Sequence, residues 1–448
     1  MQLAAFEAHI ASLLQNWREL MQSHQFDAAV VHAGANPTYY QDDQHPPFHA
    51  YGHFLRWVPT EDCEHAVLLI SQTDSPKLYW HKPDDYWYMP SSPPTFCEGI
   101  YEIREFSDVE SLTVSLRRDL GKYSDVANFG PSNTNIEANN RAAAQQDMSS
   151  QLDFRRAFKS EFEQDCIREA TVRSVRGHLA AERAFLNGAS EFDIQHDYLH
   201  ASKQTEASLP YPSIVGLNEH AAVLHYQKYD RTPPQQTHSL LIDAGAKANC
   251  YHADITRTYA ASNNGEFAEL INAVNLAQQA LIEEIHVGVP YLRIHESMHQ
   301  KVATILCDMQ LLTCSAEAAF EQRMTDVFFP HGIGHLLGLQ THDVGGHVST
   351  PEGSTTPSHD RYSSLRLLRN IEPDMVFTIE PGIYFIPSLL NAWRGHADFN
   401  WERINQFTPS GGVRIEDNVL VQSNNLTNFT RDAFTSASAG DLVANAAT

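Results

Sequence analysis

Apolar positions in the first third of the chain follow helical and strand periods in turn. Residues 26–32 (FDAAVVH) and 65–71 (HAVLLIS) are continuous apolar runs that predict buried strands, and residues 77–80 follow as a partner for the second. Helical spacing, typical of an amphipathic surface helix, connects Phe6, Ile10, Leu13, Leu14 and Trp17. We therefore expect residues 1–158 to form a small α/β domain.

A domain boundary is predicted just after Phe158. Ser160 and Glu163 have the spacing of a capping box, which marks the start of a long helix. Beyond it, helical patterns cover residues 160–187, 190–206, 265–286 and 291–311. Strand patterns lie between and after them, at 239–245, 252–261, 375–387 and 411–422. Grouped helices with hairpin-like strands predict an α+β fold for residues 159–448 rather than a doubly wound parallel sheet.

Three further segments have loop-like composition. Residues 41–59 are rich in aromatic side chains, His, Pro and Asp, which fits either a binding loop or a packed surface loop. Residues 345–364 are a loop by composition that could form the rim of an active site. The residues after Val421 are rich in Asn, Thr, Ser and Ala and are expected to fray.

Composition excludes several classes of partner. The 448 residues include 55 acidic and 31 basic side chains, a formal net charge of −24, so neither nucleic acid nor an anionic membrane is expected as a partner. The N-terminus lacks the pattern of a signal peptide, and no apolar run has the length of a membrane span. The six cysteines are irregularly spaced, which favours reduced thiols and a cytoplasmic protein.

Two acidic residues end or begin strand-like segments close together in the sequence. Asp243 closes the apolar run SLLID, and Asp254 lies in YHADITRTY eleven residues later. A hairpin could bring the two carboxylates side by side, where they repel each other unless a cation or a proton lies between them. Alternatively, Asp243 merely starts a turn before Gly245, and Asp254 pairs with Arg257.

Three more segments carry side chains that can bind metal ions. HGIGH contains His331 and His335, its glycines disfavour a regular helix, and His342 follows. Glu380 precedes Pro-Gly at the end of a strand pattern, and Glu416 shares a predicted strand face with Arg414. Each segment alone also fits an ordinary surface ion pair or turn. Together, four carboxylates and an imidazole suit two divalent cations such as manganese.

The motifs LIDAGA, ADITRTY, HGIGH, HDVGG, TIEPG and RIEDN, in this order over residues 160–422, resemble those of the "pita-bread" metallopeptidases. Within that family the chain is most similar to bacterial Xaa-Pro dipeptidases (prolidases) and to the related organophosphorus acid anhydrolases. The resemblance implies a C-terminal pita-bread catalytic domain after a smaller N-terminal α/β domain. It also implies two Mn²⁺ ions per subunit, with other divalent metals possible, held by Asp243, Asp254, His335, Glu380 and Glu416.

The same resemblance assigns roles to residues around the metals. Glu380 would transfer protons, with Glu416 as the less favoured alternative, and His342 would stabilise the reacting carbonyl. His331 would be a further catalytic residue, at a position that matches the family's pocket. Arg369 and His225 would bind the carboxylate of the substrate's proline, which restricts substrates to dipeptides. Other positions that match the family's pocket are Tyr211, Tyr291, Arg414 and Asp43. Asp43 would line the active site of the partner in a homodimer.

The resemblance leaves two alternatives for the activity. Phosphotriester or phosphorofluoridate hydrolysis fits the same kind of site, as a main or a side activity. A non-enzymatic binding module of the same fold is disfavoured, because all five expected ligands are present.

Overall fold

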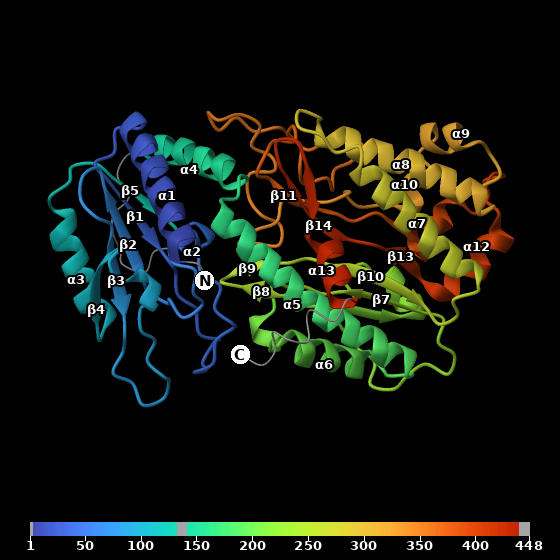
Figure 1. Cartoon of the computed structure of the whole chain (residues 1–448), viewed down its shortest axis with the longest axis horizontal. Helices are drawn as coiled ribbons and strands as arrows, with labels where there is room; N and C mark the ends of the chain where they lie inside the picture. The colour runs from blue at the N-terminus through green and yellow to red at the C-terminus, as the bar shows by residue number, and fades with distance from the viewer. Residues whose placement is uncertain (1–2, 132–140, 439–448) are drawn as a thin grey trace. The chain divides into compact units, whose positions relative to one another are not determined.

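The computed structural model describes residues 3–131 and 141–438 and divides the chain into two compact units (Figure 1). The N-terminal unit comprises Met1–Arg156, Ser160–Glu163 and Thr350–Ser354, and the C-terminal unit comprises the remainder. The boundary falls within the first turn of the long helix α5 (Glu161–Leu186).

The N-terminal unit is built on one mixed five-stranded sheet in the order β4-β3-β2-β1-β5. Its three central strands are antiparallel, β1 with β2 and β2 with β3. The outer strands pair in parallel, β5 with β1 and β4 with β3. The strands are β1 (Ala28–His32), β2 (Val67–Ser71), β3 (Lys77–His81), β4 (Glu102–Phe106) and β5 (Val126–Phe129). The three strands predicted from apolar runs are confirmed.

Helices cover both faces of this sheet (Figure 1). Leu112 and Leu116 of α3 pack on Val30 and Leu69 on one face. On the other face, Trp17 of the predicted N-terminal helix contacts Phe129 of β5, with ring centroids 5.2 Å apart. The helices are α1 (Leu3–Ser23), α2 (Gly52–Trp57), α3 (Val109–Leu120) and α4 (Ala142–Arg156), with a 3₁₀ turn η1 (Thr95–Cys97).

The prediction of a loop over residues 41–59 is wrong for its second half. Residues Gly52–Trp57 form α2, whose six residues are all buried. The indole of Trp57 packs edge-on against Trp17, with centroids 6.0 Å apart, so these aromatic side chains belong to the core. The first half is a loop, and its residues 41–45 are exposed.

A buried ion pair within the N-terminal unit completes the predicted capping box. The backbone N–H of Ser160 donates to Glu163 Oε2 (2.9 Å), and that of Glu163 donates to Ser160 Oγ (3.4 Å). Glu163 is 1% exposed, and both its oxygens accept from the guanidinium of Arg56 at 3.0 and 3.1 Å. Burial alone would raise the pKa of Glu163, but the charges of Arg56 and His9 and these hydrogen bonds lower it to about 2.

Replacing this carboxylate should destabilise the protein in a pH-dependent way. Glu163→Gln removes one partner of a buried pair and should lower the free energy of unfolding by about 3 kcal/mol at neutral pH. Because the pKa of Glu163 is lowered on folding, its contribution is complete above the unfolded value and is lost as pH falls towards about 2.

Denaturant unfolding of both proteins at several pH values tests this expectation. The gap between wild type and Glu163→Gln should fall by roughly half or more between pH 6 and pH 3. Glu161→Gln, which changes an exposed carboxylate in the same helical turn, is the matched control and should stay within about 0.5 kcal/mol of wild type. A gap that does not depend on pH would contradict the assignment.

The C-terminal unit contains the four long helices predicted from sequence. They are α5, α6 (Glu191–Ser202), α7 (Glu266–Ile282) and α8 (Tyr291–Asp308). Shorter helices are α9 (Ala316–Glu321), α10 (Thr325–Phe328), α11 (Pro387–Leu390), α12 (Trp401–Phe407) and α13 (Phe429–Ser438). No helix among the described residues combines the length and apolar character needed to cross a membrane.

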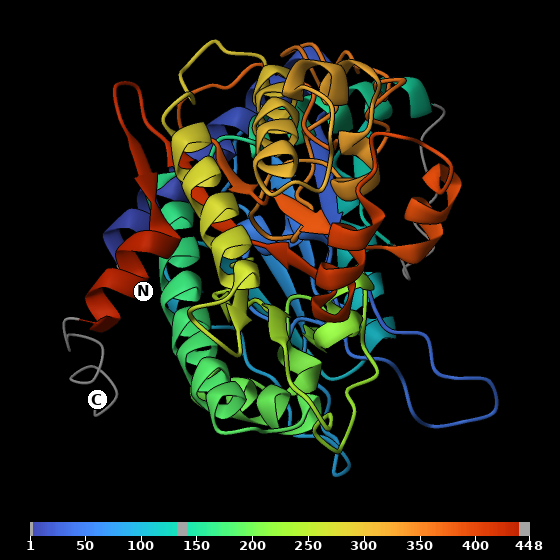
Figure 2. The same ribbon diagram turned by 90° about the vertical axis from the view of Figure 1, so that its right-hand side faces the viewer.

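Strands of the C-terminal unit lie between two layers of helices, α5 and α6 on one side and α7 and α8 on the other (Figures 1 and 2). The main sheets have the orders β10-β7-β6 and β11-β14-β15, and β12-β13 and β8-β9 are two-stranded. The strands are β6 (Ile214–Leu217), β7 (Ser239–Asp243), β8 (Lys247–Ala248), β9 (Tyr251–His252), β10 (Thr256–Ala260), β11 (Val376–Ile379), β12 (Gly382–Tyr384), β13 (Gly412–Arg414), β14 (Asp417–Val421) and β15 (Leu426–Asn428). The α+β prediction is confirmed.

The expected fraying after Val421 is wrong as far as residue 438. Residues Phe429–Ser438 form α13, and Phe429 is 1% exposed. Arg431 of this helix donates to the buried Asp417 at 2.7 Å, and the hydroxyl of Thr430 accepts from the backbone N–H of Asn418. Polar composition concealed a helix that is held by buried hydrogen bonds. Residues 439–448, the end of that prediction, lie outside the described residues.

Candidate metal centre and active site

A hairpin brings the first two candidate ligands together, as the sequence suggested. Strands β7 and β10 pair antiparallel with Asp243 opposite Thr256, and Asp254 lies two residues before β10. The hydroxyl oxygen of Tyr211 lies 2.8 Å from Asp243 Oδ1 and 2.5 Å from Asp254 Oδ1, so its one O–H can donate to either carboxylate. One hydroxyl within reach of both carboxylates shows that they converge.

His335 and Glu380 come from two extended segments that run antiparallel. The backbone N–H of Thr378 donates to the His335 carbonyl at 2.9 Å, and that of Glu380 to the Ile333 carbonyl at 2.8 Å. Gly334 permits this close approach, since a Cβ there would lie 2.0 Å from the Thr378 carbonyl oxygen. His335 Nε2 then lies 3.7 Å from Glu380 Oε1 and 3.5 Å from Asp254 Oδ2.

Glu416 joins the same cluster from the segment between β13 and β14. The hydroxyl of Thr256 donates to Glu416 Oε2 at 2.7 Å, and the backbone N–H of Glu416 donates to the Thr256 carbonyl at 3.0 Å. One ligand atom each from Asp254, His335 and Glu416 lie within 4.8 Å of one another, and all three residues are buried. Four of the five predicted ligands therefore lie close to one another, and Asp243 joins them through the hydroxyl of Tyr211.

The ligands occupy breaks in the strands that the sequence predicted to be continuous. Asp254 lies between β9 and β10, Glu380 between β11 and β12, and Glu416 between β13 and β14. Asp243 is the last residue of β7. At a break the backbone leaves its ladder, so the carboxylate can turn out of the pleat towards the cluster.

Burial and mutual repulsion make this cluster unfavourable without cations. Burial, together with neighbouring carboxylates, raises the pKa of Asp243 to about 6, that of Glu380 to about 7 and that of Glu416 well above its usual value. The imidazole of His335 faces the carboxylates through Nε2, while Nδ1 lies 3.1 Å from the Leu336 carbonyl oxygen. This hydrogen bond leaves Nε2 free to coordinate a metal, so the donor set fits hard divalent cations.

Two further histidines lie beside the ligands. His331 Nε2 is 2.8 Å from the Tyr384 hydroxyl, and Nδ1 is 3.6 Å from Glu380 Oε2. The ring of His342 stands at 89° to that of His335, with centroids 4.4 Å apart. Burial lowers the pKa of His331 to about 3 and of His342 to about 4, and the charge of His225 is a smaller cause for both. His331 and His342 are thus neutral near pH 7.

Arg414 supports several residues of the site and does not bond Glu416 directly in the described contacts. Its guanidinium donates to Asp243 Oδ2 (2.7 Å), to the Tyr384 hydroxyl (2.8 Å) and to Thr256 Oγ1 (3.1 Å). Thr256 therefore stands between Arg414 and Glu416, so the two predicted neighbours are joined through a shared hydroxyl rather than as a surface ion pair. With Arg414 only 4% exposed, its visible role is to hold Asp243 and Tyr384.

Two other predicted pocket residues have their polar atoms engaged with the protein. Tyr291, fully buried, donates to the Thr378 carbonyl at 2.9 Å and so supports the strand beside His335. Arg369 donates to Glu372 Oε1 (2.6 Å) and to the Gly345 carbonyl (3.5 Å). Gly345 belongs to the loop that carries His342, so Arg369 contacts this loop and not the metal ligands in the described bonds.

His225 and Asp43, also predicted to bind substrate, are exposed side chains. His225 follows the 3₁₀ turn η3 (Asn218–Ala222) between β6 and β7. Asp43 belongs to the N-terminal unit, where its carboxylate accepts from Gln44 at 3.2 Å.

Three side chains that the sequence did not single out help to build the site. Thr256 bonds Glu416, Thr378 accepts from the backbone N–H of His335 at 3.2 Å, and Tyr384 joins His331 to Arg414. Thr256 and Thr378 lie within strands and are fully buried. In the strand pattern YHADITRTY, alternation places Thr256 on the same face as Asp254. Nothing in the sequence indicated a role for Tyr384 except that it lies four residues after Glu380.

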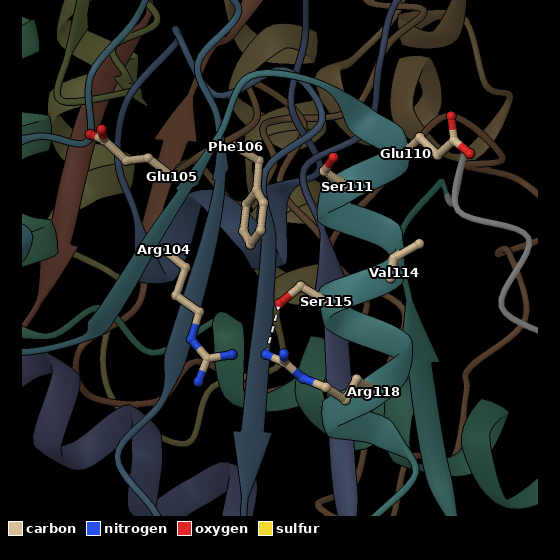
Figure 3. Close-up of a pocket in the computed structure, with 8 residues that line it drawn as sticks. All are labelled: Arg104, Glu105, Phe106, Glu110, Ser111, Val114, Ser115 and Arg118. Atoms are coloured by element: carbon tan, nitrogen blue, oxygen red, sulfur yellow. Dashed lines mark hydrogen bonds between the residues drawn. The ribbon is translucent and has the colours of Figure 1, made fainter.

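A separate cavity of about 660 Å³ lies in the N-terminal unit between β4 and α3 (Figure 3). The guanidinium groups of Arg104 and Arg118 point towards one another there, whereas Glu110 points away. Arg104 donates to Asp119 Oδ2 (2.5 Å), and Arg118 donates to Ser115 Oγ (3.5 Å). Both cations have acceptors within the protein, and the cavity shares no residue with the candidate metal centre.

Family comparisons cover nearly the whole chain. Metallopeptidase family M24 matches residues 165–423, which include all five candidate ligands. The N-terminal domain of Xaa-Pro dipeptidase matches residues 4–154.

Individual relatives agree with these matches. The chain is 40% identical to Xaa-Pro dipeptidases of Sodalis glossinidius (over 95% of this chain and 97% of the relative) and Serratia proteamaculans (95% and 98%). Among solved structures, aminopeptidase PepP from Pseudomonas aeruginosa matches with a TM-score of 0.68 at 21% identity over 96% and 98% of the two chains. Proline aminopeptidase P II from Yersinia pestis gives 0.67 at 21% identity over 94% and 96%. These two structures support the fold alone.

Proposed function

Because the chain belongs to metallopeptidase family M24, we propose that it is a metal-dependent dipeptidase that hydrolyses Xaa-Pro dipeptides and releases proline. One observation carries the proposal: a buried cluster of Asp254, His335 and Glu416, in a chain 40% identical over 95% of its length to Xaa-Pro dipeptidases. Asp243, Asp254, His335, Glu380 and Glu416 would hold the ions, two per subunit. Manganese is the metal that we propose, because oxygen-rich donor sets suit it.

The ions would supply Lewis acidity, which activates water and polarises the scissile carbonyl. Glu380 accepts the proton of the attacking water and delivers it to the leaving proline nitrogen. Its side chain, 18% exposed and 3.6 Å from His331, is accessible to a substrate. His342 would donate a hydrogen bond to the carbonyl oxygen as negative charge develops. His331 would act beside it as a pocket residue, because its Nδ1–H already donates to the Gly332 carbonyl at 2.8 Å. A neutral imidazole can donate through its one N–H without introducing a competing charge.

His225 and Arg369 would recognise the carboxylate of the substrate's proline and so limit substrates to dipeptides. The exposure of His225, and the effect of its charge in lowering the pKa of His331 and His342, support this role. Arg369 would bind the carboxylate once its guanidinium releases Glu372. Alternatively, it would act indirectly by holding the loop that carries His342 through the Gly345 carbonyl. Tyr211, Tyr291 and Arg414 would shape the pocket through the ligands and strands that they hold.

A homodimer would complete the pocket with Asp43 of the neighbouring subunit. Support comes from exposed aromatic side chains in the N-terminal unit, which mark interaction surfaces when they cluster. The ring of Tyr88 lies 6.3 Å from that of His45, two residues from Asp43, and Tyr86 and Trp87 are 87% and 75% exposed. Cytoplasmic residence is proposed because no disulfide joins the cysteines of the described residues.

Hydrolysis of organophosphorus compounds is not favoured as the main activity. The similar curated proteins are named Xaa-Pro dipeptidases, and the donor set alone does not separate the two chemistries. A non-enzymatic module is likewise not favoured, since a buried, ligand-complete cluster of acids would only destabilise a protein that bound no cation.

A substrate panel tests the proposed function directly. Protein stripped with a chelator and reloaded with Mn²⁺ should hydrolyse a Xaa-Pro dipeptide, with a Xaa-Pro-Xaa tripeptide at least about 100-fold slower in kcat/KM because its proline carboxylate is absent. A phosphorofluoridate should react more slowly than the dipeptide. Full activity of the stripped protein, or equal rates on dipeptide and tripeptide, would overturn the proposal.

A further inference from the structure

One buried carboxylate fastens the segment that carries His225. Glu191, the first residue of α6, is 1% exposed. Its Oε1 accepts from the backbone N–H of Leu217 and from His220 Nδ1, both at 2.8 Å. Its Oε2 accepts from the Tyr226 hydroxyl and from the backbone N–H of Asp230, both at 2.7 Å. Residues 217–230, which we call the His225 loop, are thus held at both ends and in the middle.

The hydrogen bonds of Glu191 explain why the group acts as a clamp and not as a cation site. Ligand atoms of Glu191, His220 and Asp230 lie within 4.8 Å of one another, a spacing that a metal could use. However, each Glu191 oxygen already accepts two short hydrogen bonds from the protein. Asp230 is exposed and takes part in the clamp through its backbone N–H. The observed role is therefore to join the loop to α6.

The His225 loop is connected to the active site through the packing of Tyr226 near Tyr384. The ring of Tyr226 stacks on His220, with centroids 4.4 Å apart, and is 7% exposed. Tyr226 belongs to the same apolar cluster as Tyr384. The Tyr384 hydroxyl in turn contacts His331 and Arg414, each at 2.8 Å. His225 directly precedes Tyr226, so a shift of Tyr226 moves His225 relative to the metal cluster.

We propose that Glu191 is a positioning residue that sets the place of His225 at the substrate's carboxylate. The inference rests on the proposed function for the identity of the substrate. Without Glu191, the loop would lose the bonds that hold Leu217, His220 and Tyr226, and would keep those of Tyr229 to Ser213 and of Asp230 to Phe192. A misplacement of His225 by about 1 Å costs of the order of 100-fold in rate. Glu191 does not touch the substrate and acts through the loop.

A double-mutant cycle separates this role from general support of the fold. Glu191→Gln keeps the size but turns one acceptor oxygen into an NH₂ donor, and should lower kcat/KM on a Xaa-Pro dipeptide about 10- to 100-fold, mostly through KM. In the His225→Ala background the same change should cost less than about 2-fold, because the group being positioned is gone. An equal loss in both backgrounds, or no loss in either, would overturn the proposal.

Limited trypsin digestion measures how often the His225 loop opens and does not depend on an activity assay. Lys228 and Arg231 are exposed cleavage sites at the end of the loop. Glu191→Gln should raise the rate of cleavage there at least about 10-fold, because the loop opens locally. Tyr226→Phe, which removes one of the four donors, should fold well and give a smaller increase. Unchanged cleavage in both variants would overturn the anchoring role.

A matched control removes effects of lower stability alone. Glu163→Gln also deletes a buried helix-terminal carboxylate, but in the N-terminal unit, and should leave cleavage at Lys228 and Arg231 unchanged. An inactive wild-type enzyme would overturn the proposed function, and the digestion would still decide whether Glu191 anchors the loop. Normal wild-type activity with additive losses in the cycle would overturn only the link to His225.

Discussion

Asp254→Asn should reduce kcat/KM for a Xaa-Pro dipeptide by at least about 10³-fold, a loss of about 4 kcal/mol of transition-state stabilisation. Asp254 lies at the centre of the cluster, with Oδ1 2.5 Å from the Tyr211 hydroxyl and Oδ2 3.5 Å from His335 Nε2. Asparagine has the same shape but no charge, and its NH₂ group cannot coordinate a cation. The variant should also bind less metal, measured as ions per chain after dialysis.

Asp119→Asn is a control that shows whether neutralising any buried aspartate would reduce activity and metal content. Asp119 is 3% exposed in the N-terminal unit and accepts from Tyr79 at 2.6 Å. Asp119→Asn should lower thermal stability yet leave metal content unchanged. If Asp254→Asn keeps both its metal and more than about a tenth of wild-type activity, the cluster is not the metal centre that the sequence motifs indicate.

Periodic segments were predictable from the sequence because one residue pattern determined each. The helical repeats gave α5 to α8 to within a few residues at their starts, where capping side chains such as Ser160 and Ser190 fix the first turn. The hairpin of Asp243 and Asp254 followed from two apolar runs with a short connection. The ligand set, by contrast, came from a resemblance over many motifs, since no single segment distinguished a ligand from a surface acid.

Features that depend on contacts between distant segments were not predictable. The strand break at Glu416 arises where the chain leaves one sheet for another, and nothing local specifies that point. The break at Glu380, by contrast, was indicated by the Pro-Gly that follows it. Helix α2 looked like a loop because its aromatic side chains are buried against α1, whose contribution the local pattern does not contain. Arg414 shares a face with Glu416 in a flat strand, but the break between β13 and β14 turns its guanidinium towards Asp243.

Glu380→Gln should lower kcat by about 10³-fold and change KM little, because glutamine cannot accept the proton that the reaction must move. Glu380 differs from the other ligands in its surroundings: its side chain is 18% exposed, and one oxygen faces His335 while the other faces His331. Glutamine keeps one oxygen for coordination, so metal content should fall less than in Asp254→Asn. Steady-state kinetics at saturating Mn²⁺ would separate the two effects.

The matched variant Glu380→Asp retains a carboxylate that is one methylene shorter and should keep more activity than Glu380→Gln, since it can still exchange a proton. Loss of ligation alone predicts the opposite order, because the shorter side chain reaches the ions less well than the isosteric amide. If Glu380→Gln at full metal occupancy keeps more than about a tenth of the wild-type kcat, proton transfer belongs to another residue. Glu416, buried and bonded to Thr256, would then be the next candidate, and its exchange for glutamine should produce the kcat loss expected here of Glu380.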